Sequence, residues 1–386
     1  MAEMTSRERV AAALRHQEPD RVPLDIGGGQ STSLVVEAAE NLARHLGMPG
    51  GPALLSKTFR LARLDEAMFV HLGSDVRPVT LHPPRNWSPP LSPPDSFVDE
   101  LGVRWRKAPF AGGYYWEQAS YPLAEATLAD LETYPWPDPH DPGRYAGLAE
   151  EVAQLYRETP YALMGDCGYK NHFEPAFTLL GMERALTALI EEPEFMRALL
   201  DKLHQITAAT TRRFLEITGR YLTVIRTSDD VATQRSPLIS TATYRKMIKP
   251  YHTRYFRLIK EYTGAPIFYH SCGNVVPLLD ELIDAGVEVL NPVQVAAFAD
   301  PAEVKARFGA RLSFRGGVDT QWVLPFGTPE EVRQEVRLRV SQFGPGGGFV
   351  AASVHNIQAD VPPQNILAMA AAVREYGRYP IDIITI

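Results

Sequence analysis

A chain of 386 residues, 45% of them hydrophobic, can bury a large core, which predicts one large barrel or two domains. Its 46 acidic and 39 basic residues give a net charge of −7 without a block of like charge, which argues against nucleic acid and anionic membranes and favours a small-molecule partner. The two cysteines, Cys167 and Cys272, form no CxxC pair, and no apolar run reaches membrane-spanning length. Because the N-terminal segment also lacks a signal sequence, we expect a cytoplasmic protein.

The N-terminal third predicts a helix over 7–15, an apolar strand over 22–26 and a second helix over 34–46. Three glycines, 27–29, separate the strand from the second helix. A strand, glycines and a helix could cradle a phosphate, but the sequence has neither GxGxxG nor the Lys-Ser/Thr pair of a P-loop. A tight turn between strand and helix is therefore the favoured interpretation.

The segment 77–120 is expected to be an elaboration of the fold. Its first part, 77–95, is rich in proline and predicts an irregular excursion. Residues 99–106 and 114–118 alternate in polarity around a glycine pair, which predicts a β-hairpin. The hairpin could serve as a lid or as a contact in a homodimer, and the sequence leaves both open.

The C-terminal half alternates short apolar runs with amphipathic stretches, which is typical of βα units around a parallel sheet. The expected strands are 222–226, 266–269, 287–290, 311–314 and 348–352, and the expected helices are 242–262, 275–285, 301–308, 329–343 and 363–376.

Polar residues follow each of these five strands, which decides between two architectures. Barrel enzymes take site residues from the C-terminal ends of many strands, whereas an open sheet concentrates them at one switch point. The sequence therefore predicts a (β/α)8 TIM-type barrel over 1–386 with an N-terminal elaboration and an inserted hairpin. The strand-end residues are Asp229 and Asp230, His270 and Cys272, Asn291 and Gln294, Gly316, Gly317 and Asp319, and His355 and Asn356.

Two of these strand-end residues, His270 and Cys272, have the spacing of a metal site. Side chains two positions apart on an extended segment project to the same side, and zinc accepts both imidazole and thiolate. A catalytic zinc needs three protein ligands, and His355 is the best candidate for the third. A packed histidine beside a buried thiol is the structural alternative.

The remaining polar residues predict the walls of the pocket. Asp230 could orient a substrate or donate a proton, with loop capping as the alternative for it and for Asp229. The other candidates for substrate contacts are Asp229, Asn291, Gln294, Asn356, Tyr169 and His172. Cys167 is expected to be a buried free thiol.

Segments spread over nearly the whole chain resemble the uroporphyrinogen decarboxylase superfamily. They are 6–14, 19–23, 270–273, 286–292, 316–319 and 355–362. The resemblance implies a single-domain (β/α)8 barrel. It also implies one of two activities, because the superfamily contains cofactor-free decarboxylases and zinc-dependent methyltransferases that work with methylcobamide partners.

The motifs are more similar to the methyltransferase branch than to the decarboxylases. That branch carries the HxC pair seen at His270 and Cys272, with a third ligand, usually Cys, where this chain has His355. The decarboxylases place two carboxylate-binding arginines where this chain has the glycines 27–29. The decarboxylase resemblance nevertheless implies site roles for Asp75 and His355.

The expected function is a zinc-dependent methyltransferase that moves a methyl group between a small donor or thiol and a separate corrinoid (cobalamin) protein. A site with two histidines and one cysteine is one unit more positive than one with two cysteines, which favours oxygen or amine methyl donors. The alternatives are a metal-free decarboxylase that uses Asp75 and His355, and a non-catalytic barrel that binds a small molecule.

Overall fold

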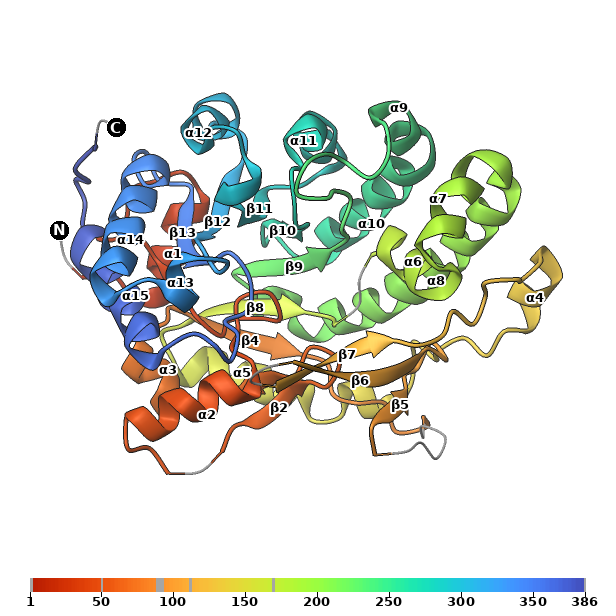
Figure 1. The fold of residues 1–386 in the computed structure, drawn as a ribbon, viewed down its shortest axis with the longest axis horizontal. Coiled ribbons are helices and arrows are strands. Elements are labelled where there is room, and N and C mark those ends of the chain that lie inside the picture. Colours follow the sequence, from red (N-terminus) through yellow and green to blue (C-terminus); the bar gives the residue numbers. More distant parts are fainter. Residues whose placement is uncertain (1–2, 50, 88–93, 111–112, 169–170, 385–386) are drawn as a thin grey trace.

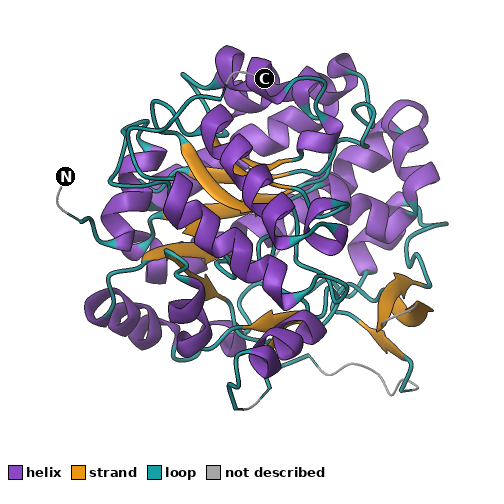
Figure 2. Ribbon diagram, turned by 60° about the vertical axis from the view of Figure 1, so that its left-hand side comes forward, coloured by secondary structure: helices purple, strands orange, loops and turns teal. Residues whose placement is uncertain are grey.

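Eight strands form the core of the computed structural model, which describes residues 3–49, 51–87, 94–110, 113–168 and 171–384. Their order is β1-β13-β12-β11-β10-β9-β8-β4, and every neighbouring pair in it is parallel. Helices surround the strands on the outside (Figure 2). This nearly closed barrel confirms the predicted (β/α)8 fold.

The barrel strands are short and buried, as expected for strands covered on both faces. Their arrangement can be followed in Figure 1, and their bounds are β1 (Leu24–Asp25), β4 (Val76–Thr80), β8 (Ala162–Asp166), β9 (Val224–Ser228), β10 (Ile267–His270), β11 (Val289–Val293), β12 (Ser313–Val318) and β13 (Phe349–Ser353).

The five predicted C-terminal strands are confirmed, but each continues one to four residues further than its apolar run. The polar residues at the strand ends belong to the ladder, because His270 pairs with Ser228 on one side and with Asn291 on the other. Parallel pairing therefore brings His270 beside Asn291.

The helices confirm most of the predicted pattern. Helices α12, α14 and α15 have the predicted bounds because each begins with proline, which favours the first helical position. None of the described helices is both long and apolar enough to cross a bilayer. The α-helices are α1 (Ser6–Leu14), α2 (Val36–His45), α3 (Glu66–Leu72), α4 (Leu128–Thr133), α5 (Leu148–Glu158), α6 (Phe173–Leu180), α7 (Met182–Glu191), α8 (Pro193–Thr218), α9 (Thr241–Thr243), α10 (Lys249–Tyr262), α11 (Leu279–Ala285), α12 (Pro301–Phe308), α13 (Val323–Phe326), α14 (Pro329–Phe343) and α15 (Pro363–Tyr376).

The prediction of an irregular segment over 77–95 is wrong at its start, because β4 is a barrel strand that pairs with β8. Pro78 lies within β4. Proline has no N–H group to donate to the hydrogen-bond ladder, so within sheets it is found mainly in edge strands. Strand β4 is the last in the hydrogen-bonded order, so its other edge has no ladder to interrupt.

The predicted hairpin is confirmed as part of a small antiparallel sheet of β5 (Ser96–Val98), β6 (Arg104–Phe110) and β7 (Gly113–Gln118). Gln118 Nε2 donates to Thr178 O at 2.5 Å, which ties the sheet to α6. A second small sheet pairs β2 (Ala53–Ser56) with β3 (Leu61–Arg63), and the turn between them faces β7 through Arg60, which donates to Tyr114 O.

Candidate metal centre

The structure brings the three predicted metal ligands together at the C-terminal end of the barrel. His270 is the last residue of β10, Cys272 lies two residues beyond it, and His355 lies two residues beyond β13. One ligand atom from each lies within 4.8 Å of the others. The His270 and His355 rings are 5.6 Å apart between centroids.

The distance between His270 and Cys272 fits a tetrahedral zinc ion. Zn–N bonds of about 2.0–2.1 Å and Zn–S bonds of about 2.3 Å imply an N to S separation of roughly 3.5 Å. His270 Nε2 lies 3.5 Å from Cys272 Sγ. These three side chains could therefore hold zinc and leave a fourth position for substrate, which is the arrangement of catalytic zinc sites.

Asn291 orients the first of these ligands. Its Oδ1 lies 2.5 Å from His270 Nδ1, and its Nδ2 donates to Arg315 O at 3.2 Å. An amide oxygen can only accept, so Nδ1 of His270 carries the proton and Nε2 presents its lone pair to Cys272. The predicted substrate contact of Asn291 is therefore wrong: its side chain is fully buried and holds the candidate metal ligand His270 in place.

We expect Asn291→Ala to lower zinc affinity about 10- to 100-fold, because partners that orient a metal-binding histidine contribute that much. Competition with a chromophoric chelator measures the affinity. Asn365→Ala is the matched control, since that buried amide donates to Leu324 O and Gly327 O, outside the candidate site. Equal affinities in both variants would show that Asn291 does not orient His270.

Asp230 and Gln294 hold the backbone of the loop that carries Cys272. The Cys272 N–H donates to Asp230 Oδ1 at 2.8 Å, and the Gly273 N–H donates to Gln294 Oε1 at 2.6 Å. Gly273 has a φ of 89°, and a Cβ there would clash with Thr233 O. The side-chain oxygen of Gln294 thus positions this loop, and its contact with substrate stays a prediction.

Asn356 has a similar role on the other side of the site. Its Oδ1 accepts the Ser33 N–H at 3.0 Å, and its backbone oxygen accepts from Gln358 Nε2 at 3.0 Å. The first bond connects the segment after His355 to the loop after β1, and the second lies within that segment. Asn356 also lines a cavity together with His355, so its predicted place at a pocket wall is retained.

Asp229 and His172 lie in a separate, fully buried cluster, and their predicted substrate contacts are wrong. Asp229 accepts the backbone N–H groups of His172, Phe173 and Glu174 at 3.1, 2.9 and 2.6 Å, and it lies 2.9 Å from His252 Nε2. Its charge thus caps the N-terminus of α6.

His172 is enclosed by other side chains of this cluster. Its Nε2 lies 3.0 Å from His204 Nδ1, and burial holds the pKa of His172 well below its usual range. Burial also lowers the pKa of His204 to about 4. The ring is therefore neutral and packed. Tyr169, the other predicted wall residue, lies outside the described residues.

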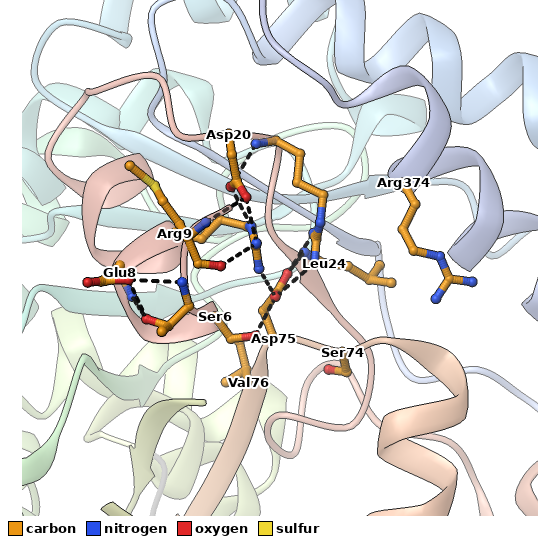
Figure 3. Close-up of polar contacts among 12 residues, drawn as sticks. Ser6, Glu8, Arg9, Asp20, Leu24, Ser74, Asp75, Val76 and Arg374 are labelled. Atoms are coloured by element: carbon orange, nitrogen blue, oxygen red, sulfur yellow. Dashed lines mark hydrogen bonds and ion pairs between the residues drawn. The ribbon is translucent and has the colours of Figure 1, made fainter. Parts of the chain in front are cut away.

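Asp75 lies at the opposite end of the barrel from the candidate metal ligands, so the site role that the resemblance to the decarboxylases implied for it is wrong. It immediately precedes β4 and accepts the Leu24 N–H at 2.8 Å, Arg9 Nη1 at 2.7 Å and Arg21 Nη1 at 2.8 Å (Figure 3). With 1% exposure, this carboxylate is the centre of an ion-pair network beneath the barrel.

Two ion pairs inside the barrel were missed by sequence reasoning. Arg315 pairs with Asp25, and its Nη1 approaches Met164 Sδ across the barrel at 3.0 Å. Arg226 Nη1 lies 3.3 Å from Asp166 Oδ1. The sequence carried a signal for these pairs, because each of the two apolar strands contains an arginine. In a strand buried on both faces, a charged side chain costs free energy unless it has a partner.

Comparisons with known proteins agree with this architecture. The model of the family described as Uroporphyrinogen decarboxylase (URO-D) matches residues 117–376. The uroporphyrinogen decarboxylase of Pseudomonas fluorescens (strain Pf-5) is 25% identical over 275 residues, 68% of this chain and 73% of that protein. The one from Aeromonas salmonicida is 26% identical over 309 residues, 77% and 81% of the two chains.

A solved structure covers the chain more fully. A methyltransferase from Methanosarcina mazei superposes with a TM-score of 0.66 at 19% identity, covering 97% of this chain and 99% of that one. At this identity the likeness concerns the fold. The family match confirms the resemblance inferred from the motifs: the chain belongs to the uroporphyrinogen decarboxylase (URO-D) family.

Proposed function

We propose that this chain is a zinc-dependent methyltransferase that moves a methyl group between a small donor or thiol and a corrinoid protein. The observation that carries the proposal is the convergence of ligand atoms from His270, Cys272 and His355 within 4.8 Å at the strand ends. Family membership and the methyltransferase among the structural neighbours support it at the level of the fold.

Zinc bound there would supply a Lewis acid with one open position for a substrate oxygen, nitrogen or sulfur. Two residues of the protein fix the geometry of that open position. Asn291 keeps the proton of His270 on Nδ1, and Asp230 accepts from the backbone of Cys272. Such fixed geometry places a substrate atom without further reorganisation, which is where rate acceleration by positioning arises.

The charges inside the barrel support this function over decarboxylation. The decarboxylase alternative needs Asp75 and His355 in one site, yet they lie at opposite ends of the strands. The described residues of the 27–33 loop include no arginine, and the interior Arg226 and Arg315 are paired with carboxylates.

Metal content and methyl transfer test the proposal together. Protein purified without added zinc should contain about one zinc per chain, and the zinc-loaded protein should methylate cob(I)alamin from a methyl ether, methylamine or methyl thioether. The visible spectrum of cobalamin reports the transfer. Absence of zinc, or coproporphyrinogen formation from uroporphyrinogen, would refute the proposal. Zinc without transfer from any donor would favour a binding protein.

Asp230 offers a finer test of how the loop is held. We expect Asp230→Ala to lower methyl transfer about tenfold to a thousandfold while zinc stays bound, because the acceptor for the Cys272 N–H is lost. Asp230→Asn keeps an oxygen acceptor, so it should retain most of the activity. Equal losses in both variants would instead assign a proton-transfer role to the carboxylate, and wild-type rates in both would make it a loop cap.

A further inference from the structure

We propose that the cavity between the hairpin and the barrel mouth binds the aromatic ring of the methyl donor, which makes the donor an aryl methyl ether. This inference rests on the proposed function and narrows its substrate class. The cavity has a volume of about 180 Å³. It is lined by Val35, Thr58, Phe59, Arg60, Trp105, Tyr115, Trp116, His355, Asn356 and Gln358.

The cavity has the size and the location for such a ring. In another protein, an apolar cavity of roughly 150 Å³ accommodates benzene. His355, one of the three candidate metal ligands, forms part of this cavity's wall. A ring held there can therefore place its methoxy group toward the centre formed by His355, His270 and Cys272.

The aromatic wall is held in place by contacts behind it. Trp105 Nε1 donates to Asp99 Oδ2 at 2.8 Å, and Asp99 also accepts the Leu101 and Val103 N–H groups at 2.9 and 3.0 Å. Phe97 stacks on Trp105 and meets the edge of Trp116, with centroid separations of 6.3 and 4.8 Å. Because the indole N–H of Trp105 already has an acceptor, the apolar surface of its ring can contact a ligand.

Fixed aromatic walls favour an aromatic ligand over an aliphatic one of equal size. Ring pairs gain from offset or edge-to-face geometry in addition to the area that they bury, and the gain corresponds to about a twofold to tenfold change in affinity. A rigid wall also loses little conformational freedom when the ligand binds.

The charge of the residues that line the cavity favours ethers over methylated amines as ligands. Arg60 is the permanently charged residue among the described lining residues, and none of those is Asp or Glu. Arg60 is paired with Glu37 and lies 3.8 Å over the Tyr114 ring. Glu37, which pairs with Arg60, does not line the cavity. A quaternary ammonium there would meet aromatic faces but no carboxylate to balance its charge, whereas a neutral aryl ether needs none.

In the proposed reaction, the corrinoid accepts the methyl group of the ether. The bond between the methyl carbon and the ether oxygen breaks, and the electron pair of cob(I)alamin forms the new bond between cobalt and carbon. The phenolate leaves with the electrons of the broken bond and takes a proton from solvent. The products are methylcobalamin and a phenol.

Binding of 1,2-dimethoxybenzene, measured by titration calorimetry on wild-type protein and on Cys272→Ser, tests the cavity apart from the metal. We expect Trp105→Ala to weaken binding at least tenfold and Trp105→Phe to stay within about threefold of wild type. Methoxycyclohexane and phenyltrimethylammonium should bind about threefold to tenfold more weakly. Trp322→Ala is the matched control, because that side chain is 69% exposed and does not line the cavity.

The outcomes separate this inference from the proposed function. Trp105-dependent binding in a protein that holds no zinc would support the aromatic site and refute the zinc methyltransferase. Zinc together with methyl transfer from an amine, but no binding of 1,2-dimethoxybenzene, would refute the aromatic site alone. Equal affinity of wild type and Trp105→Ala, or tighter binding of phenyltrimethylammonium, would also overturn it.

Discussion

Replacing Cys272 with serine is expected to abolish zinc binding and leave the barrel folded. A serine hydroxyl keeps its proton at neutral pH, so the site loses its only anionic ligand among the three. Loss of one of the three ligands is expected to weaken zinc binding roughly a hundredfold to a thousandfold, because the total zinc affinity of such sites is large. The side chain is half-buried on a loop beyond β10, outside the core. Elemental analysis after dialysis and circular dichroism measure the two effects.

Cys167→Ser is the matched control for this experiment. Cys167 is the other cysteine of the chain, and it is 3% exposed. Burial raises the pKa of its thiol to about 12, so it stays protonated and is a poor metal ligand. The control should keep one zinc per chain. Stoichiometric zinc in Cys272→Ser, or loss of zinc in Cys167→Ser, would contradict the assigned ligand set.

The sequence predicted the convergence of His270, Cys272 and His355 because their placement depends on strand geometry alone. An extended segment that ends in His270 and Cys272 puts both side chains on one side, and a parallel barrel collects all strand ends on one face. His355 reaches the same place after β13. Helix bounds were equally accessible where a proline marks the start, as at Pro301 and Pro329.

The roles of the amides and carboxylates were less accessible, since the same side chain can bind a ligand or accept a backbone N–H. Buried N–H groups nearly always need an acceptor. Asp229 serves three such groups at the start of α6, and Gln294 serves Gly273. Which N–H faces a given oxygen is set by tertiary packing, which strand and helix periodicity does not contain.

The cavity beside His355 also depends on tertiary packing. Its wall joins Phe59 and Arg60, between β2 and β3, to Trp105 and Trp116 of the hairpin. These segments are about fifty residues apart in sequence. The sequence predicted the hairpin itself but left open whether it covers the mouth. The shared cavity places its aromatic residues against a candidate metal ligand.

Asp75→Asn is expected to destabilise the protein by roughly 3–5 kcal/mol without releasing zinc, because removing one partner of a buried ion pair leaves uncompensated charge. The carboxylate receives Arg9, Arg21, the Ser6 hydroxyl and the Leu24 N–H, all within 3.0 Å. The amide supplies one acceptor in place of two and carries no charge. Urea unfolding followed by circular dichroism gives the free-energy difference.

Asp20→Asn provides the comparison that makes this result specific to Asp75. Asp20 also pairs with Arg9, at 2.7 Å, but its side chain is 14% exposed and water can replace part of the lost interaction. We expect it to lose about 1 kcal/mol, within the range of partly exposed pairs. If Asp75→Asn instead unfolded like wild type and lost methyl transfer, Asp75 would belong to the catalytic machinery, as the resemblance to the decarboxylases implied. The buried network beneath the barrel predicts the opposite result: a weakened fold around an intact metal centre.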